Sequence, residues 1–329
     1  MRHLLPVLGL IAPTFFAPSV SATDYLTIDT CDQFVEFFNN RNYGTYIELN
    51  RDLDCKNSPT LTKNITYTIN GNGFTISNLN FDSTSSVFAR KLNLQDITFE
   101  NTTIHNNDED FFLWVDKRWS NVTFNNLVTT GKPFEMLFYS LKNVELTDLS
   151  IDLSGVKLEN VKTLLGEFVN DSRITNLNLS GATIQRRNDW VLALLVDDTQ
   201  DSYFTNIKLK DFDIYGEPTG ANGRTTFIDT IENIHVNGLS VENVHFSRSE
   251  NDSFFHYERD EQSTYVNISH NLFDDTTDVG AIPAVAMPRG DVTGRIINFE
   301  SMNQPLLPPA MCTPYLLQDS YFGIKPPTE

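Results

Sequence analysis

Three aspartates in one short stretch have the residue type that glycoside hydrolysis needs. Asp197 and Asp198 are adjacent, and Asp201 follows three residues later. Two carboxyl groups on either side of a glycosidic bond can act as general acid and as base or nucleophile. Adjacent residues on a strand point to opposite faces, so Asp197 and Asp198 make a poor catalytic pair. These three are the catalytic candidates if the protein is an enzyme, but a non-enzymatic role is favoured.

A basic and aromatic stretch comes just before these aspartates. Arg186, Arg187, Asp189 and Trp190 combine charges with a large ring. Guanidinium and carboxylate groups can hydrogen-bond hydroxyls, and an aromatic face can stack on a sugar ring. The stretch therefore predicts a ligand-binding site on an insertion. In the alternative, Trp190 belongs to the core strand that follows, Val191–Val196.

A metal site has little support in the sequence. Asp108, Glu109 and Asp110 could hold Ca²⁺ together with carbonyls and water. No recognised loop frame surrounds them, so a solvated acidic loop is the simpler interpretation. The histidines show no metal-ligand spacing, and no Ser-His-Asp or Cys-His set follows from spacing. We therefore expect neither a metal nor a cofactor.

The element that must position these residues is a repeated one. A nine-residue phrase recurs, with Asn or Asp first, Asn, Asp or Gly sixth, and mostly apolar residues at positions two, four, seven and nine. Its copies begin at Asp96, Asn121, Asn143, Asn176, Asn206 and Asn233. Starts separated by 22 to 33 residues predict a solenoid. The regular leucine frame of a leucine-rich repeat is absent, and the period is too short for a propeller blade.

The phrase also predicts how each coil turns. Positions four and seven would face opposite sides of a straight strand, yet both are mostly apolar. Asn, Asp and Gly at position six tolerate the left-handed backbone conformation, so they predict a sharp corner. The residues at position one would stack about 4.8 Å apart and hydrogen-bond in a ladder. A third apolar stretch completes each coil, which favours a parallel β-helix.

The two ends of the chain differ from the repeat. Residues 1–22 have the basic start, apolar region and small-residue cleavage site of a secretory signal. Residues 23–45 predict an N-terminal cap, since Thr30 and Gln33 form a capping box before a short amphipathic helix. The β-helix is expected over 46–299, and proline-rich residues 300–329 are expected to form an irregular C-terminal cap and tail.

Cysteine content and charge bound the environment and the partners. Cys31 and Cys55 lie where the cap should meet the first coil, so a disulfide is expected between them, with Cys312 left over. A net charge of −19 argues against nucleic acid and against an anionic membrane surface. No later segment reaches 18 apolar residues, so we expect no transmembrane segment. The mature chain is expected to be secreted or on the cell surface, or in the periplasm if the source is bacterial.

The chain resembles secreted right-handed parallel β-helix proteins. Its opening stretches, 28–34 and 46–54, look like the entry segment of bacterial GLUG-type adhesin-like repeats. The stretch 70–79 is similar to their first full coil. The resemblance implies a surface or secreted binding protein. It departs from those repeats at their Gly-Leu-x-Gly, where this chain has Ser86-Val87-Phe88-Ala89.

The same fold is shared by the pectin-lyase-like superfamily of polysaccharide lyases and hydrolases. The Gly-His-Gly and Arg-Ile-Lys companions of a galacturonan hydrolase are absent, as is the Trp-Ile-Asp-His context of a pectate lyase. The function expected is therefore a non-catalytic, adhesin-like binder of glycan or protein surfaces. The alternatives are a polysaccharide lyase or glycoside hydrolase, and a purely structural coat or matrix component.

Overall fold

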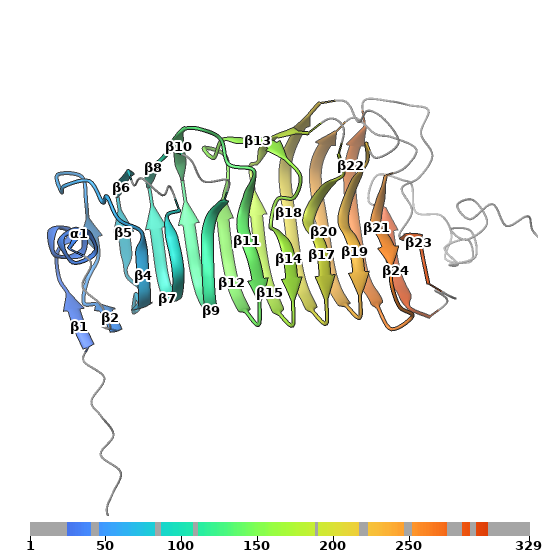
Figure 1. Ribbon diagram of the computed structural model, residues 1–329, viewed down its shortest axis with the longest axis horizontal. Helices are drawn as coiled ribbons and strands as arrows, with labels where there is room; N and C mark the ends of the chain where they lie inside the picture. The colour runs from blue at the N-terminus through green and yellow to red at the C-terminus, as the bar shows by residue number, and fades with distance from the viewer. Residues whose placement is uncertain are drawn as a thin grey trace, which may run out of the picture.

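The computed structural model describes residues 25–40, 46–82, 87–107, 111–187, 190–216, 223–246, 252–274, 285–289 and 294–301. Within them the chain forms a parallel β-solenoid with one helix, α1 (Cys31–Asn39). Its coils stack in a single direction, from α1 at one end to β24 at the other (Figure 1). This confirms the predicted all-β class and parallel β-helix.

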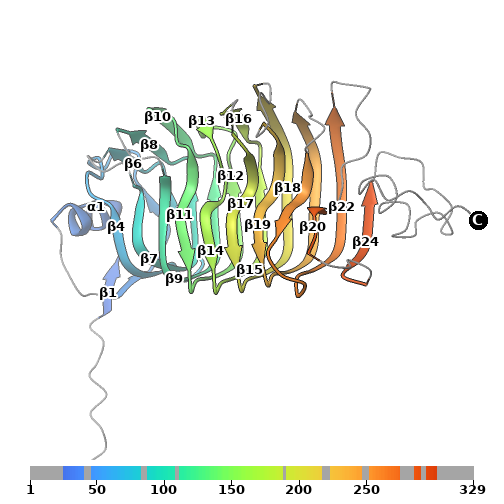
Figure 2. The same ribbon diagram turned by 45° about the vertical axis from the view of Figure 1, so that its right-hand side comes forward.

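Each coil contributes strands to three walls, and all pairings are parallel. The first sheet comprises the start of β9 (Phe111–Asn125) followed by β11 (Met136–Lys142), β14 (Gly166–Asn170), β17 (Leu192–Gln200), β19 (Thr225–Glu232), β21 (Ser253–Glu258) and β23 (Val285–Met287). Of these strands, β11, β14, β17 and β19 are labelled in both Figure 1 and Figure 2 and lie side by side in each. The second sheet comprises β2 (Tyr46–Leu49), β4 (Ile65–Asn70), β7 (Ala89–Glu100), β9 (Phe111–Asn125), β12 (Glu145–Asp152), β15 (Arg173–Ser180), β18 (Tyr203–Tyr215), β20 (His235–Phe246), β22 (Thr264–Asp274) and β24 (Ile296–Ser301).

Shorter strands complete the coils. They are β1 (Tyr25–Ile28), β3 (Leu53–Asp54), β5 (Thr75–Ser77), β6 (Asn80–Asp82), β8 (Thr103–Asn106), β10 (Val128–Gly131), β13 (Leu158–Val161) and β16 (Thr183–Arg186). The β1 strand precedes α1 and pairs with β2, so regular structure begins ahead of the predicted start of the β-helix at Tyr46. The first strands of the chain therefore already belong to the stack.

The core is a column of apolar side chains that runs through the coils. Leu146, Leu149 and Ile151 of β12 are all buried, although the first two are an odd number of positions apart. Asp148 lies between Leu146 and Leu149 with a φ of 53°, and this left-handed residue turns both side chains inward. The predicted bend is thus confirmed, and it is what closes the wall around the core.

Left-handed residues form three corners that repeat from coil to coil. The first corner holds Asn143, Asp171, Asp201 and Asn233; the second holds Asp96, Asn121, Asp148, Asn176, Asn206, Gly238, Asn267 and Asn298; the third includes Asn101, Asn126, Gly181, Asp211 and Asn243. Many of the Asn and Asp side chains at these corners are hydrogen-bonded to their counterparts on the next coil. Asn206 donates to Asn176 at 3.0 Å, and Asn298 donates to Asn267 at 2.9 Å. The predicted ladder is confirmed for the pairs Asp96–Asn121 and Asn176–Asn206, but Asn143 and Asn233 do not belong to it.

The repeat has a different phase from the one predicted. Leu149 pairs with Val122 on one side and Leu177 on the other, which places Asp148, and not Asn143, level with Asn121. Two of the six phrases, those beginning at Asn143 and Asn233, therefore start at the first corner and not at the second. The cause is that all three corners use the same residue types. Ladder partners at the second corner are 25, 28, 30 and 31 residues apart, so the coils are more regular than the phrase suggested.

The helix α1 covers the start of the stack. The Thr30 side chain accepts a hydrogen bond from the Gln33 backbone amide, and the Gln33 side chain accepts one from the Asp29 amide. This arrangement confirms the predicted capping box, except that the Gln33 side chain bonds the backbone amide of Asp29 and not that of the N-cap residue Thr30. A disulfide joins Cys31 of α1 to Cys55 after β3, with Cα atoms 5.2 Å apart. Over the described ranges no helix is long and apolar enough to cross a membrane.

Candidate functional site

One row of outward-facing residues crosses the first sheet, with one residue from each coil. The strand register places Trp114, Tyr139, Glu167, Asp197, Asp229 and His256 at the same level on successive coils. Paired strands lie about 4.8 Å apart, so neighbouring members of this sheet-face row can touch. The row begins with two aromatic residues, continues with three carboxylates and ends with a histidine.

Two cations are set among these carboxylates. The Lys162 ammonium lies 2.7 Å from an Asp197 carboxylate oxygen and 3.5 Å from one of Glu167. The Arg224 guanidinium donates a 2.8 Å hydrogen bond to Asp229. All five side chains are largely shielded from solvent, so the contacts act in a lower dielectric than water. The row is therefore a nearly charge-balanced network.

The carboxyl groups of the row do not share one environment. Burial raises the pKa of Asp229, and the negative charge of Asp197 adds to the rise; Arg224 and Lys162 offset it only in part. Burial lowers the pKa of Lys162, but its hydrogen bond to Asp197 and the charges of Asp197 and Glu167 outweigh that effect, so the net pKa is raised. The pKa values of Asp229 and Lys162 are thus both raised, the first mainly by burial and the second by its carboxylate partners.

His256 closes the row and is almost fully buried. Burial and the nearby charge of Arg224 lower its pKa to about 4, so the imidazole is neutral at neutral pH. Its Nδ1 atom has no hydrogen-bond partner. A buried, unpaired ring nitrogen beside a half-buried carboxylate is a polar group that a ligand or a water molecule could satisfy.

Trp190 stands at the edge of the row and is exposed over 41% of its surface. The Lys162 ammonium lies 5.3 Å from its ring centroid, and the Arg187 guanidinium lies 4.7 Å away. Two cations over one indole fix its orientation through cation–π attraction. The alternative that Trp190 is a core residue does not hold, because β17 begins at Leu192 and the indole remains outside.

The predicted ligand-binding stretch divides into an exposed and a buried part. Arg186 is only 2% exposed, and its guanidinium donates to the Thr225 hydroxyl at 2.9 Å and to the Arg224 carbonyl at 2.8 Å. The expectation that all of this stretch lies outside the core is wrong for Arg186, because it bonds across to the next coil. Arg187 and Trp190 are exposed, while Asp189 lies outside the described residues. Ligand binding by this stretch stays a prediction.

The three candidate aspartates are not brought together. Asp197 bonds Lys162, whereas Asp198 lies 3.2 Å from Arg259, as expected for adjacent residues that point apart. Asp201 lies at the first corner, where it accepts a 2.6 Å hydrogen bond from Asn233. The neighbour that Asp197 does find is Asp229, one coil later. Catalysis by any of these aspartates stays a prediction, and the acidic loop at 108–110 lies outside the described residues.

Sequence reasoning missed Glu167, Asp229 and His256 as site residues. They are separated by a full coil each, so no local motif contains them. The signal that could have found them is the position of each residue relative to the first corner. Glu167, Asp197 and Asp229 each precede a first-corner residue by four, and these corners are Asp171, Asp201 and Asn233.

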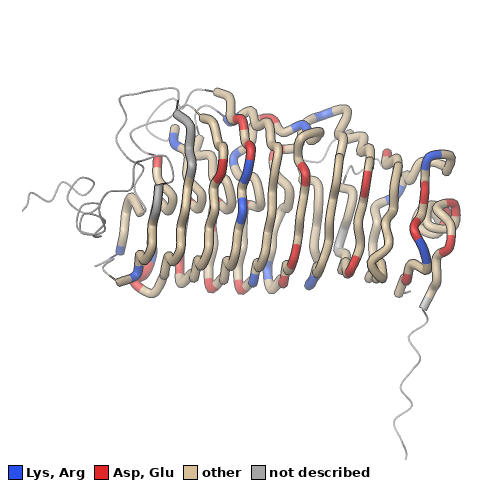
Figure 3. Tube along the Cα trace, turned by 180° about the vertical axis from the view of Figure 1, so that it is seen from behind, with Lys and Arg blue, Asp and Glu red and all other residues tan. Residues whose placement is uncertain are grey.

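The first sheet also exposes large apolar side chains within the row and beside it. Tyr139, Phe168, Tyr257 and Met287 are exposed over 38–54% of their surfaces. Phe111 packs against Tyr139, with ring centroids 5.4 Å apart. Lys and Arg residues are interspersed with Asp and Glu residues along the trace of the opposite side of the solenoid too (Figure 3). An amphipathic strip of rings and paired charges is the kind of surface that recognises sugars or protein.

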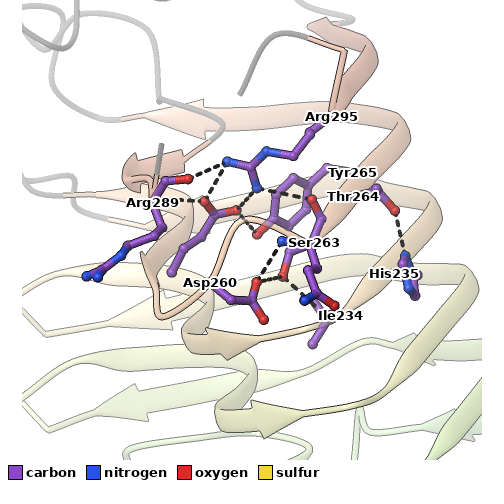
Figure 4. Close-up of polar contacts among 10 residues, drawn as sticks. Ile234, His235, Asp260, Ser263, Thr264, Tyr265, Arg289 and Arg295 are labelled. Carbon is purple, nitrogen blue, oxygen red and sulfur yellow. Dashed lines mark hydrogen bonds and ion pairs between the residues drawn. The ribbon is translucent and has the colours of Figure 1, made fainter. Parts of the chain in front are cut away.

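A second polar cluster lies at the C-terminal end, around a carboxylate that is closed to solvent. Glu258 accepts hydrogen bonds from both Arg295 terminal nitrogens at 3.0 Å, from the Tyr265 hydroxyl at 2.6 Å and from the Arg289 amide at 3.0 Å (Figure 4). Burial and the Glu258 charge raise the pKa of Tyr265 well above its usual range. The Glu258 side chain is fully buried, so this cluster holds the last coil in place and offers no site.

Comparison with known proteins finds a similarity in the N-terminal part of the chain. A family model described as "Putative pectate lyase-like adhesive domain" matches residues 25–136, roughly a third of the 329 residues. No curated protein and no solved structure matches the chain. The match covers α1, the disulfide and the first coils, but of the row only Trp114 falls within it. Together with the parallel solenoid, the match supports a pectin-lyase-like β-helix.

Proposed function

We propose that this pectin-lyase-like β-helix is a secreted or cell-surface, adhesin-like protein that binds glycan through the outer face of its first sheet. The observation that carries the proposal is the exposed Trp190 indole, held between Lys162 and Arg187 beside the sheet-face row. An exposed ring with fixed orientation can stack on a sugar face. The carboxylates and cations around it supply acceptors and donors for sugar hydroxyls.

The surrounding architecture supports this role. Arg186 bonds the carbonyls of both Trp190 and Arg224, at 3.4 and 2.8 Å, so one buried residue positions the indole and the cation that faces Asp229. A site that is rigid before binding loses less conformational entropy when it binds. The adhesive family model supports surface binding in general terms. The disulfide supports an oxidising location outside the cytoplasm.

The test is a glycan array probed with the purified protein and with single variants. Trp190→Ala should lose most of the array signal, and Trp190→Phe should retain it, since a ring is preserved. Ile297→Ala is the matched control, because Ile297 is exposed to a similar extent, 45%, but lies at the far C-terminal end of the solenoid. An array without signal, or an equal signal for Trp190→Ala and wild type, would reject the glycan site.

A glycoside hydrolase is the second candidate, and one observation favours it. Asp197 and Asp229 lie level on neighbouring coils, and the pKa of Asp229 is raised by burial and by the Asp197 charge. A carboxyl with a raised pKa next to a second carboxyl is an arrangement that general acid catalysis uses. Release of reducing sugar by the pure protein, lost in Asp197→Asn and in Asp229→Asn, would favour this candidate over the adhesin.

A further inference from the structure

The two ends of the solenoid differ in how their strand edges are protected. At the start of the stack, α1 covers the core and is tied to the first coils by the Cys31–Cys55 disulfide. At the other end, β23 pairs with β21 and β24 pairs with β22, and within the described part of the chain neither has a second neighbour. Figure 1 shows these two strands at the opposite end of the stack from α1. The described solenoid therefore has one capped end and one end with open strand edges.

The open edge of β24 directs backbone polar groups away from the stack. The Tyr265 amide donates to the Arg295 carbonyl at 2.8 Å, which fixes the phase of the ladder between β22 and β24. In a parallel pair, alternate residues of a strand bond one neighbour, and the residues between them face the other side. Ile296 therefore directs its backbone N–H and C=O to the open edge. An edge of this kind is a template for pairing with another strand.

The sequence of β24 does nothing to protect this edge. Native edge strands are usually short, bulged, or interrupted by Pro or Lys. The six residues 296–301 include neither Pro nor Lys, and their single charge is that of Glu300. The pair of Glu258 and Arg295 holds the coil that carries the strand. The edge is therefore both unprotected and fixed in place before any contact is made.

The end of the core column is apolar where it meets this edge. Ile296 and Phe299 pack against the core but are only half-buried, and the Phe299 ring centroid lies 5.0 Å from that of Phe254. Both side chains turn inward because Asn298 between them is left-handed, with a φ of 55°. Ile297 faces outward and is 45% exposed. The strand thus has two arms that meet at the second corner, and each arm carries one inward apolar side chain.

We propose that a second copy of this chain docks on this end, with the two C-terminal ends facing each other about a two-fold axis. An axis that passes between Ile297 and Asn298 exchanges the two arms of β24 and pairs them antiparallel. Ile296 then lies opposite the partner's Phe299, so the two half-buried side chains on each copy cover one another. The contact is self-complementary and closes as a dimer.

The capped end favours this arrangement over a head-to-tail stack. A head-to-tail contact would bring β24 against α1 of the next copy, and it would continue into a fibre instead of closing. One cross-section of the solenoid is smaller than an obligate interface, so a reversible dimer is expected. The dimer contact uses no residue of the sheet-face row, so it stands or falls independently of glycan binding.

The first measurement is sedimentation equilibrium of the purified chain over a range of protein concentrations. Wild type should show a monomer–dimer equilibrium. Added salt should strengthen association, because two copies with a net charge of −19 each repel one another. Ile297→Lys should weaken association about tenfold or more, because lysine protects an edge strand. Val128→Lys is the matched control and should associate like wild type, since Val128 is also exposed, over 39%, but lies on β10, away from the open end.

The second measurement traps the dimer in a Cys312→Ser background. Asn298→Cys should give a disulfide-linked dimer on oxidation, because the residue lies next to the two-fold axis. Asn176→Cys occupies the same corner in the middle of the stack and should stay monomeric. A monomer at every concentration, or equal association by wild type and Ile297→Lys with both folded by circular dichroism, overturns the second copy in favour of residues 302–329 or a different protein. Species larger than a dimer overturn the two-fold arrangement.

Discussion

Arg295 donates two parallel hydrogen bonds to the carboxylate of Glu258, each 3.0 Å long, across 37 residues of chain. The pair joins β21 to the turn before β24, and the Tyr265 hydroxyl between them donates a third bond to the same carboxylate. A solenoid must close the exposed end of its core, or the last coil frays. A fully buried carboxylate that is completely hydrogen-bonded closes this end without leaving an unpaired polar group.

Removing one partner of this pair should therefore cost far more than removing one partner of an exposed pair. We expect Glu258→Ala and Arg295→Ala each to lower the free energy of unfolding by about 3–5 kcal/mol, because an uncompensated buried charge remains. Lys208→Ala is the control: Lys208 and Glu242 are 2.9 Å apart but partly exposed, and the loss should stay below about 1 kcal/mol. Urea unfolding measures all three. Similar losses of unfolding free energy for the buried and the exposed pair would contradict the proposed role of Glu258 and Arg295 at the end of the solenoid.

Substitutions at Gly238 test whether the second corner needs a left-handed backbone. Its φ is +81°, and a Cβ there would lie 2.9 Å from the Asn206 side-chain oxygen, which can move away. Gly238→Asn should cost about 1 kcal/mol or less, because Asn tolerates this conformation and occupies the same corner at Asn206 and Asn267. Gly238→Val should cost about 2 kcal/mol or more, since a β-branched residue resists a positive φ. Thermal unfolding compares the two, and equal melting temperatures would argue against the corner.

The corner residues also explain what could be predicted from the sequence and what could not. The αL conformation favours Asn, Asp and Gly, so the order of residue types showed where the corners are. The apolar residues between the corners then showed the strands and the core. The phase was not, because Asn143 at the first corner and Asn176 at the second have the same side chain and the same left-handed φ. Only the register of Leu149 with Val122 and Leu177 separates the two corners.

The candidate site was predicted only where it is local in sequence. Arg187 and Trp190 are three residues apart, and their chemistry could be recognised as a unit. Asp197 and Asp229 are neighbours solely because one coil of this chain returns to the same level, and a coil length that varies hides that relationship. The burial of Arg186 could not be seen either, since its partners Arg224 and Thr225 lie on the next coil.

The disulfide at the N-terminal cap predicts that the stability of the protein depends on redox state. The Cys31–Cys55 disulfide closes a loop of 24 residues between α1 and the first coils. In the chain-entropy model such a loop stabilises by about 3.5 kcal/mol. Cys31→Ser and Cys55→Ser should each lose roughly that amount, whereas Cys312→Ser should lose none. Peptide mapping without reduction gives the direct answer, and a Cys31–Cys312 peptide would contradict this geometry.

His256 should make stability depend on pH in a defined window. Its folded pKa, about 4, lies below that of an unfolded histidine, near 6.5. As the pH falls from about 6.5 to about 4, the unfolded chain binds a proton that the folded protein excludes. Stability contributed by neutral His256 is therefore complete above this window and is lost through it, by roughly 3 kcal/mol at most.

The measurement is urea unfolding near pH 7.5 and near pH 4.5, for wild type and for His256→Gln. Carboxylates titrate in both proteins, so their share cancels in the comparison. The fall in stability between the two pH values should be smaller in His256→Gln. An identical fall would mean that His256 accepts its proton in the folded protein as readily as in the unfolded chain.

Arg186 and Arg187 are adjacent, and the structure gives them opposite roles. Arg186→Ala removes a buried guanidinium that bonds the Thr225 hydroxyl and the Arg224 carbonyl, so the free energy of unfolding should fall by about 2–4 kcal/mol. Arg187→Ala removes an exposed guanidinium that lies over Trp190, so stability should change by about 0.5 kcal/mol or less. If the first sheet binds glycan, Arg187→Ala should still weaken binding, because the indole loses one of its two cations. Denaturation and glycan titration on both variants separate the two effects. A stable Arg186→Ala protein together with an unstable Arg187→Ala protein would reverse the assignment.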